Sequence, residues 1–165
     1  MILEARTPSC FSSEYVLKAD GRPVGKYEGR WFSESLDIQL TGRRKLTLQK
    51  LGWFGSEFVL KREEPEAFHG HADRAGFFPS SWNLDLSAGP AELVKAGWFG
   101  TDYEVRRQGQ VIGRVDRVGW CERGWIAEGA DLAVEDLLLV GLVFHIIIQR
   151  RQRAAAAHGG HAAGS

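Results

Sequence analysis

The chain lacks several features that would identify its class directly. Two cysteines in 165 residues are too few for a fold held together by disulfides. The 21 basic and 21 acidic side chains cancel, so no overall charge attracts nucleic acid or an anionic membrane. A zero net charge does not exclude a local basic patch. No secretory signal, Walker loop, nucleophile elbow or paired-carboxylate motif occurs. We therefore expect a cytoplasmic, non-catalytic protein that needs no cofactor.

Glycine and aromatic residues are abundant, and they recur together in one short phrase. The phrase runs glycine, tryptophan or phenylalanine, phenylalanine, a small residue, two polar residues and an aromatic; its clearest copies are Gly52–Phe58 and Gly97–Tyr103. Weaker copies occupy residues 9–15, 30–36, 76–82 and 119–125. The third position of the phrase falls at residues 11, 32, 54, 78, 99 and 121. Six copies at this spacing predict an internal repeat of six similar units.

Each unit has the length of two strands and two turns. Apolar and polar residues alternate within units, as in Leu36–Leu40 and Tyr103–Arg106, which is the strand period. Turn-forming pairs separate one unit from the next: Asp20-Gly21, Thr41-Gly42, Ala88-Gly89 and Gln108-Gly109. Six units of two strands predict twelve antiparallel strands, in halves of about 1–63 and 67–129 joined at Glu63–Glu66.

The pattern changes after Gly129, where residues 131–153 predict a helix. Acidic residues open this segment, arginines close it, and the run Leu137–Ile148 between them is uncharged. Twelve helical residues span about 18 Å, which is short for a bilayer core of about 30 Å. A barrel of twelve strands has an interior too wide for its own side chains to fill. We therefore predict a mainly β protein, a closed twelve-stranded barrel plugged by the buried C-terminal helix.

These six turns and the apolar helix resemble the tubby C-terminal-like barrel superfamily, and the resemblance covers residues 1–153. Within it, the sequence looks most similar to small bacterial LURP-one-related and scramblase-like proteins. The resemblance implies one closed barrel around a central helix, and it implies phosphoinositide headgroups as a ligand class, since tubby proteins bind them through surface basic residues. It transfers no site residue by residue. Residues 154–165, rich in alanine and glycine, are expected to form a disordered tail.

Basic side chains form the candidate ligand site. Arg43, Arg44 and Lys45 fall in or beside a predicted turn. Arg106 and Arg107 close a predicted strand, and they should lie toward the same barrel end as Lys61 and Arg62, which close the matching strand of the third unit. Arginines on one rim would suit a phosphate headgroup. The alternative interpretation is an ordinary solvated surface, since acidic residues are interleaved with the basic ones.

Histidine and cysteine give weaker signals. His69, His71, His158 and His161 have no cysteine or carboxylate partner at a recognised metal-site spacing, so we predict no metal centre. His145 lies within the predicted plug, where burial would lower its pKa and a hydrogen bond would hold it neutral. Cys10 and Cys121 occupy aromatic positions of the repeated phrase, which predicts a packing role.

We therefore expect a binding or scaffold module, monomeric or weakly oligomeric, whose candidate partners are anionic lipid headgroups or another protein. A scramblase-like membrane protein, in which residues 132–148 leave the barrel and insert, is one alternative. A binder of single-stranded nucleic acid that uses exposed tryptophan and arginine is another. No nucleic acid is expected as the partner in the favoured interpretation, because the net charge is zero.

Overall fold

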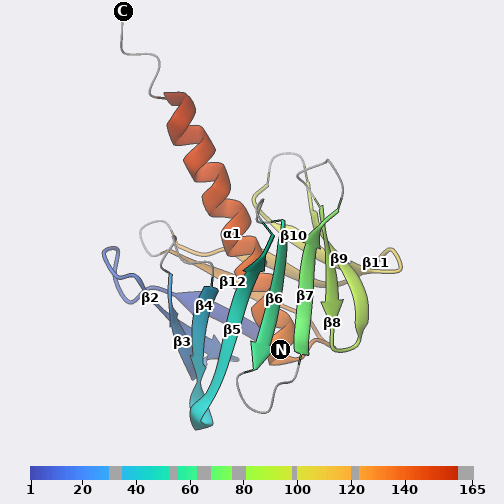
Figure 1. The fold of residues 1–165 in the computed structure, drawn as a ribbon, viewed down its shortest axis with the longest axis horizontal. Helices are drawn as coiled ribbons and strands as arrows, with labels where there is room; N and C mark the ends of the chain where they lie inside the picture. Colours follow the sequence, from blue (N-terminus) through green and yellow to red (C-terminus); the bar gives the residue numbers. More distant parts are fainter. Residues whose placement is uncertain are drawn as a thin grey trace, which may run out of the picture.

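The computed structural model of the protein describes residues 1–29, 35–52, 56–62, 68–75, 81–97, 100–119 and 123–159. It confirms a closed antiparallel barrel of twelve strands with one C-terminal helix (Figure 1). The strands are β1 (Ile2–Arg6), β2 (Glu14–Ala19), β3 (Arg22–Glu28), β4 (Ser35–Leu40), β5 (Arg44–Leu51), β6 (Glu57–Arg62), β7 (Phe68–Arg74), β8 (Ser81–Leu86), β9 (Gly89–Lys95), β10 (Tyr103–Arg107), β11 (Gln110–Arg117) and β12 (Gly124–Glu128). The helix α1 spans Val134–Gly159, and the short 3-10 turn η1 (Thr41–Arg43) joins β4 to β5.

Every strand pairs with its neighbours in the chain, and β12 closes the barrel on β1. The closing register places Ile2 opposite Glu128 and Ala5 opposite Trp125. Each predicted unit is one strand pair, β1 with β2 through β11 with β12. The phrase lies between the two strands of its unit, and most of its aromatic positions lie outside the described residues, as does the predicted connector Glu63–Glu66.

The turns between units follow from their residue types. Asp20 and Gly21, and likewise Gln108 and Gly109, have positive φ angles of 46°, 79°, 51° and 81°. Two successive positive φ angles match the twist of the flanking strands, and glycine reaches them without steric cost. The sequence pairs Asp-Gly and Gln-Gly therefore produce the tight hairpins that separate the units.

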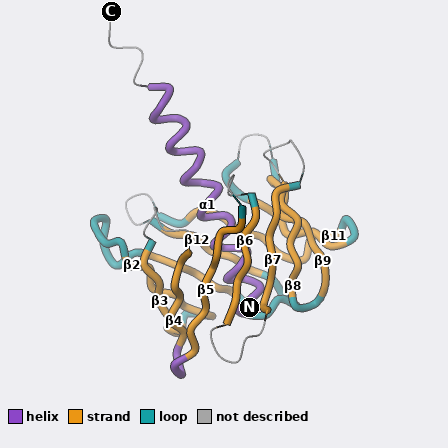
Figure 2. Tube along the Cα trace, viewed as in Figure 1, coloured by secondary structure: helices purple, strands orange, loops and turns teal. Residues whose placement is uncertain are grey.

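The helix fills the barrel, and its apolar run supplies much of the core. Figure 2 shows the strands wrapped around it. Helix α1 packs against β7 and also against β1 and β12, which lie on opposite sides of the strand order. Its buried side chains are Leu137, Leu138, Leu139, Val140, Leu142, Val143, Phe144 and Ile147. Because both sides of the helix contact strands, its apolar surface faces protein. Among the described residues, no helix combines the length and the apolar character needed to cross a bilayer.

Both ends of the helix differ from the sequence prediction. It begins at Val134 rather than Asp131, because the buried carboxylate of Asp136 accepts a hydrogen bond from the backbone N–H of Ala133 at 3.3 Å. This is one half of a capping box. It continues to Gly159 rather than ending at Arg153, because alanines 154–157 have the highest helix propensity. The expected disordered tail is therefore helical over 154–159, and residues 160–165 lie outside the described part of the chain.

The barrel has two chemically different ends. The tight-turn rim holds the turns after β2, β4, β8 and β10 (residues 20–21, 41–43, 87–88 and 108–109) and the start of α1. The long-loop rim holds residues 7–13, 118–119 and 123, the starts of β10 and β12, and the part of α1 that leaves the barrel, Gln149–Gly159. Figure 1 shows α1 projecting beyond the strands at this second end.

Candidate functional site

The predicted basic residues lie on the tight-turn rim, but on different sides of it. Arg43 is exposed in the turn before β5, with a φ of 60°. Arg44 and Lys45 open β5, and Nη1 of Arg44 lies 3.6 Å from Oε1 of Glu135 at the start of α1. In the barrel, β5 and β10 are separated by four intervening strands. The structure therefore brings the β5 group and the β10 group to one end without forming a single cluster.

The β10 pair is partly occupied by internal contacts. Arg106 donates to Oε2 of Glu104 from Nε at 3.1 Å and from Nη2 at 2.7 Å. Arg114 adds a third cationic group, with Nη2 at 3.5 Å from Oε1 of Glu104. Arg107 is different, because its Nε and Nη2 atoms are buried and have no hydrogen-bond partner among the described residues. The carboxylate of Glu104 thus neutralises much of the charge that the sequence places here.

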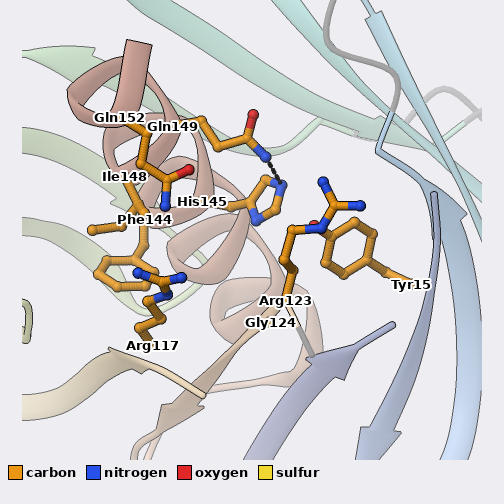
Figure 3. A pocket seen from close by; sticks show the side chains of 9 residues that line it. All are labelled: Tyr15, Arg117, Arg123, Gly124, Phe144, His145, Ile148, Gln149 and Gln152. Atoms are coloured by element: carbon orange, nitrogen blue, oxygen red, sulfur yellow. Dashed lines mark hydrogen bonds between the residues drawn. The ribbon is translucent and has the colours of Figure 1, made fainter. Parts of the chain in front are cut away.

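A second basic site, which the sequence analysis missed, lies on the long-loop rim beside α1. A pocket there is lined by Tyr15, Arg117, Arg123, Gly124, Phe144, His145, Ile148, Gln149 and Gln152. Figure 3 shows Arg117 beside Phe144 on one flank of the helix and Arg123 beside Tyr15 on the other. None of the described residues that line this pocket is acidic. The pocket is small, with a cavity volume of about 30 Å³.

Arg123 connects the pocket to the loop between β1 and β2. Its backbone N–H donates to Oγ1 of Thr7 at 3.2 Å, and its backbone carbonyl accepts from the N–H of Thr7 at 3.0 Å. Its Nη2 donates to the carbonyl of Ser12 at 3.3 Å. The same loop presents Phe11, whose side chain is 97% exposed. Arg123 is therefore held from two directions, which fixes its guanidinium at the mouth of the pocket.

His145 forms the inner wall of the pocket. Its ring meets that of Tyr15 edge-on, with centroids 4.9 Å apart, and Tyr15 stacks on Tyr27 at the same centroid distance. Burial, with the nearby Arg123 guanidinium as a second cause, lowers the pKa of His145 to about 4. Gln149 lies one turn further along α1, with its amide nitrogen 3.1 Å from Nε2 of His145. The neutral, hydrogen-bonded histidine that the sequence predicts is thus confirmed.

Arginine also marks the place where α1 leaves the barrel. Nη2 of Arg151 donates to the hydroxyl of Tyr103 at 2.6 Å, and its guanidinium lies 5.5 Å from the centre of that ring. The guanidinium of Arg150 lies 5.7 Å from the ring centre of Phe58. Burial and the neighbouring Arg74 lower the pKa of Arg150. Arg150 and Arg151 therefore contact aromatic rings of the barrel where the helix emerges.

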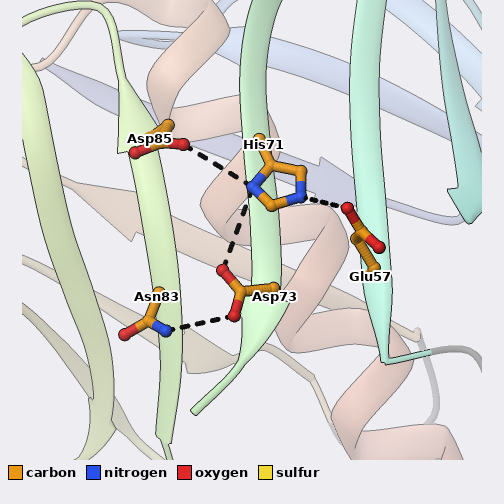
Figure 4. A network of polar contacts seen from close by, with 5 residues as sticks. All are labelled: Glu57, His71, Asp73, Asn83 and Asp85. Atoms are coloured by element: carbon orange, nitrogen blue, oxygen red, sulfur yellow. Dashed lines mark hydrogen bonds and ion pairs between the residues drawn. The ribbon is translucent and has the colours of Figure 1, made fainter.

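A polar network on the outer barrel face is the second candidate site (Figure 4). Nε2 of His71 on β7 lies 2.8 Å from Oε1 of Glu57 on β6. Its Nδ1 lies 3.6 Å from Asp85 on β8 and 3.9 Å from Asp73. Asn83 donates to Asp73 at 3.1 Å. No group of three or more side chains able to hold a metal ion occurs among the described residues.

Register explains why the sequence analysis missed both sites. Glu57 and Asp85 are distant from His71 in the chain, but strand pairing places them beside it. Arg117 precedes the sixth copy of the repeated phrase and Arg123 lies within it, and that position was the available signal for them. Cys10 is disulfide-bonded, which the sequence analysis did not predict, and the packing role expected of it stays a prediction. The side chains of His69 and His158, and all of Cys121 and His161, lie outside what the structure describes.

Comparisons with family models, with curated proteins and with solved structures found no match to this chain. The resemblance to tubby-like barrels therefore stays a prediction.

Proposed function

We propose that this protein is a non-catalytic binding module whose ligand carries a compact anionic group, such as the phosphate of a phospholipid headgroup. The ligand binds at the long-loop rim, in the pocket beside α1, with Arg117 and Arg123 supplying the charge. Guanidinium groups bind phosphate through paired, charge-assisted hydrogen bonds. The carboxamides of Gln149 and Gln152 offer further donors from the helix side.

The observation that carries this proposal is the composition of the pocket wall. Two arginines and two glutamines face the pocket together with a histidine, and no acidic residue among the described ones lines it. The pocket also lies against a rigid element, since α1 is held in the barrel by its apolar side chains. Donors held in position by packing bind an anion without a large ordering cost.

The basic residues predicted from the sequence are the competing site for the same ligand. Arg43, Arg44, Lys45, Arg106 and Arg107 share the tight-turn rim, but Arg44 lies near Glu135 and Arg106 is bonded to Glu104. A ligand there would have to compete with these carboxylates. The long-loop pocket has no such competitor among its lining residues, so we favour it.

Paired charge-removing variants distinguish the two rims. The first variant combines Arg117→Gln with Arg123→Gln, and the matched control combines Arg43→Gln with Arg44→Gln. We expect the first to weaken binding to vesicles with anionic phospholipid by about tenfold or more, and the second to change it by less than about threefold. Because Arg123 also holds the loop at Ser12, thermal unfolding of each variant checks that the fold persists.

The source of the phosphate is tested with two probes. Flotation with neutral and anionic vesicles at low and high salt measures headgroup binding, and calorimetry with a soluble inositol phosphate measures the free anion. Binding of the soluble probe without vesicle flotation would assign a soluble ligand. Binding of neither probe, or loss of binding only in the tight-turn control, would contradict the proposed site.

The two alternative functions give different results in the same assays. Flotation that resists high salt and alkaline carbonate would indicate that residues 132–148 insert into the bilayer. Salt-sensitive quenching of tryptophan fluorescence by an oligonucleotide, without vesicle binding, would instead indicate a binder of single-stranded nucleic acid.

A further inference from the structure

His145 is the one titratable group of the pocket that belongs to the buried part of α1, and its ring lies toward Arg123 and Tyr15 (Figure 3). Tyr15 from β2 meets its ring edge-on at 4.9 Å, and Tyr27 from β3 does so at 6.3 Å. Arg123, just before β12, is the charged group that acts on it, and Arg117 at the end of β11 lines the same pocket. Burial raises the pKa of Tyr15 and of Tyr27, so both hydroxyls stay neutral at physiological pH.

The contact between Gln149 and His145 depends on the tautomer of the imidazole. The amide nitrogen of Gln149, 3.1 Å from Nε2 of His145, can only donate, so the contact suits a neutral ring with its proton on Nδ1. When Nε2 gains a proton it becomes a donor, and the carboxamide of Gln149 has to rotate so that its oxygen faces the ring. The amide N–H groups then turn away from His145. One protonation therefore adds a positive charge and frees the amide N–H that had donated to the ring.

The surroundings of His145 disfavour this protonation, and a bound anion would favour it. Burial and Arg123 both disfavour a charged imidazole, and they hold the pKa of His145 near 4. A negative charge bound between Arg117 and Arg123 would attract the His145 imidazolium. It would also weaken the repulsion between the imidazolium and the two guanidinium groups. An opposite charge within about 4–6 Å shifts a pKa by about 1–3 in the direction of the charged form.

We propose that the long-loop pocket takes up a dianion together with a proton, and that His145 binds the proton while Gln149 rotates to donate to the anion. The inference rests on the proposed function, since it concerns the same pocket. By linkage, if the bound anion favours the imidazolium, acidification must tighten anion binding by the same factor. We expect roughly tenfold tighter binding at about pH 5 than at about pH 7.5.

Sulfate is the appropriate probe, because it stays a dianion across this range, whereas a phosphate monoester changes charge near pH 6. Calorimetry of the full chain gives the affinity at each pH. Repeating the titration in two buffers of different ionisation enthalpy gives the protons taken up per sulfate. NMR of the imidazole resonances, assigned with the His145 variant, follows protonation of that ring directly with and without sulfate.

Two substitutions make the test specific. His145→Gln keeps a polar side chain of similar length that cannot be protonated, so its affinity for sulfate should no longer rise with acidity. His71→Gln removes the histidine on the outer barrel face, which does not line the pocket, and should keep the full pH dependence. If His145→Gln fails to fold, the NMR titration of the wild-type ring decides the question without it.

The outcomes separate this inference from the proposal on which it rests. Proton uptake with sulfate, lost in His145→Gln and kept in His71→Gln, supports the coupling. Sulfate binding with equal affinity at both pH values, or an acid-dependent affinity that survives His145→Gln, overturns the coupling and leaves the binding site standing. No sulfate binding at either pH overturns both.

Discussion

The indole of Trp125 on β12 lies directly over Gly141 in the middle of helix α1. A Cβ atom at residue 141 would overlap the six-membered ring of Trp125, so only glycine fits there. Trp125 is fully buried, and its Nε1 donates to the hydroxyl of Tyr27 at 3.0 Å. A glycine that weakens an isolated helix thus lets the helix approach the barrel wall closely.

Replacing Gly141 by alanine tests this contact, because two effects predict opposite signs. Helix propensity alone would stabilise the protein by about 1 kcal/mol. Overlap with Trp125 forces the helix or the indole to move, and we expect a net loss of about 2 kcal/mol or more. Chemical denaturation measures the free energy of unfolding. The reverse change Ala155→Gly, in the exposed part of α1, is the control and should cost no more than about 1 kcal/mol.

The start of the plug depends on one buried carboxylate. Asp136 accepts from the backbone N–H of Ser87 at 2.8 Å and from its hydroxyl at 2.5 Å, in the turn between β8 and β9. Asp136→Asn places an amide against these donors, and we expect it to lower the free energy of unfolding by about 2–3 kcal/mol. Glu135→Gln, at the adjacent and less buried position, should change it by less than about 1 kcal/mol. Equal losses in both variants would contradict this role of Asp136.

Stability should fall on mild acidification because of His145. Its pKa is about 4 in the folded protein, below the ordinary value of 6.5, so between these values the unfolded chain binds more protons. The contribution of the neutral ring is therefore complete above pH 6.5 and is lost as the pH falls toward 4. The loss is at most about 3 kcal/mol. Comparing the unfolding free energy of wild type with that of His145→Leu across this range isolates the effect, which sulfate should reduce.

Truncation separates the plug from the projecting helix. Eight apolar side chains of α1 are buried, each contributing about 1.5–3 kcal/mol, and together they match or exceed the net stability of a typical domain, about 5–15 kcal/mol. A chain ending at Ala133 should therefore fail to give a cooperative unfolding transition. A chain ending at Arg153 loses only exposed or undescribed residues and should unfold within a few degrees of the full-length protein.

Local features of the sequence account for most of the fold prediction. Alternation in stretches such as Leu36–Leu40 predicted strands, and pairs such as Asp20-Gly21 predicted the hairpin turns, because both depend on backbone preferences of neighbouring residues. The helix boundaries were less accurate, since the start depends on a distant partner. Asp136 fixes that start through Ser87, and no local pattern links residues 49 positions apart.

The long-loop pocket could not be predicted from the sequence for a related reason. Runs of basic residues are visible in the chain, so Arg43, Arg44 and Lys45 were found, but the carboxylates that face them and their neighbours were not. Arg117 and Arg123 are isolated in the sequence and meet only at the wall of α1. Net charge and spacing do not report such a meeting, because it depends on which strands close the barrel.

By itself, the sequence determined that six two-strand units form a closed barrel and that an apolar helix must be covered by protein. Both conclusions follow from periodicity and from the cost of leaving a dozen apolar residues in water. Only the tertiary structure decided where α1 sits in the ring, and hence that Gly141 meets Trp125 and His145 faces Arg123. Register and packing bring together residues from opposite ends of the chain, and a pattern along the chain carries no information about distances across the barrel.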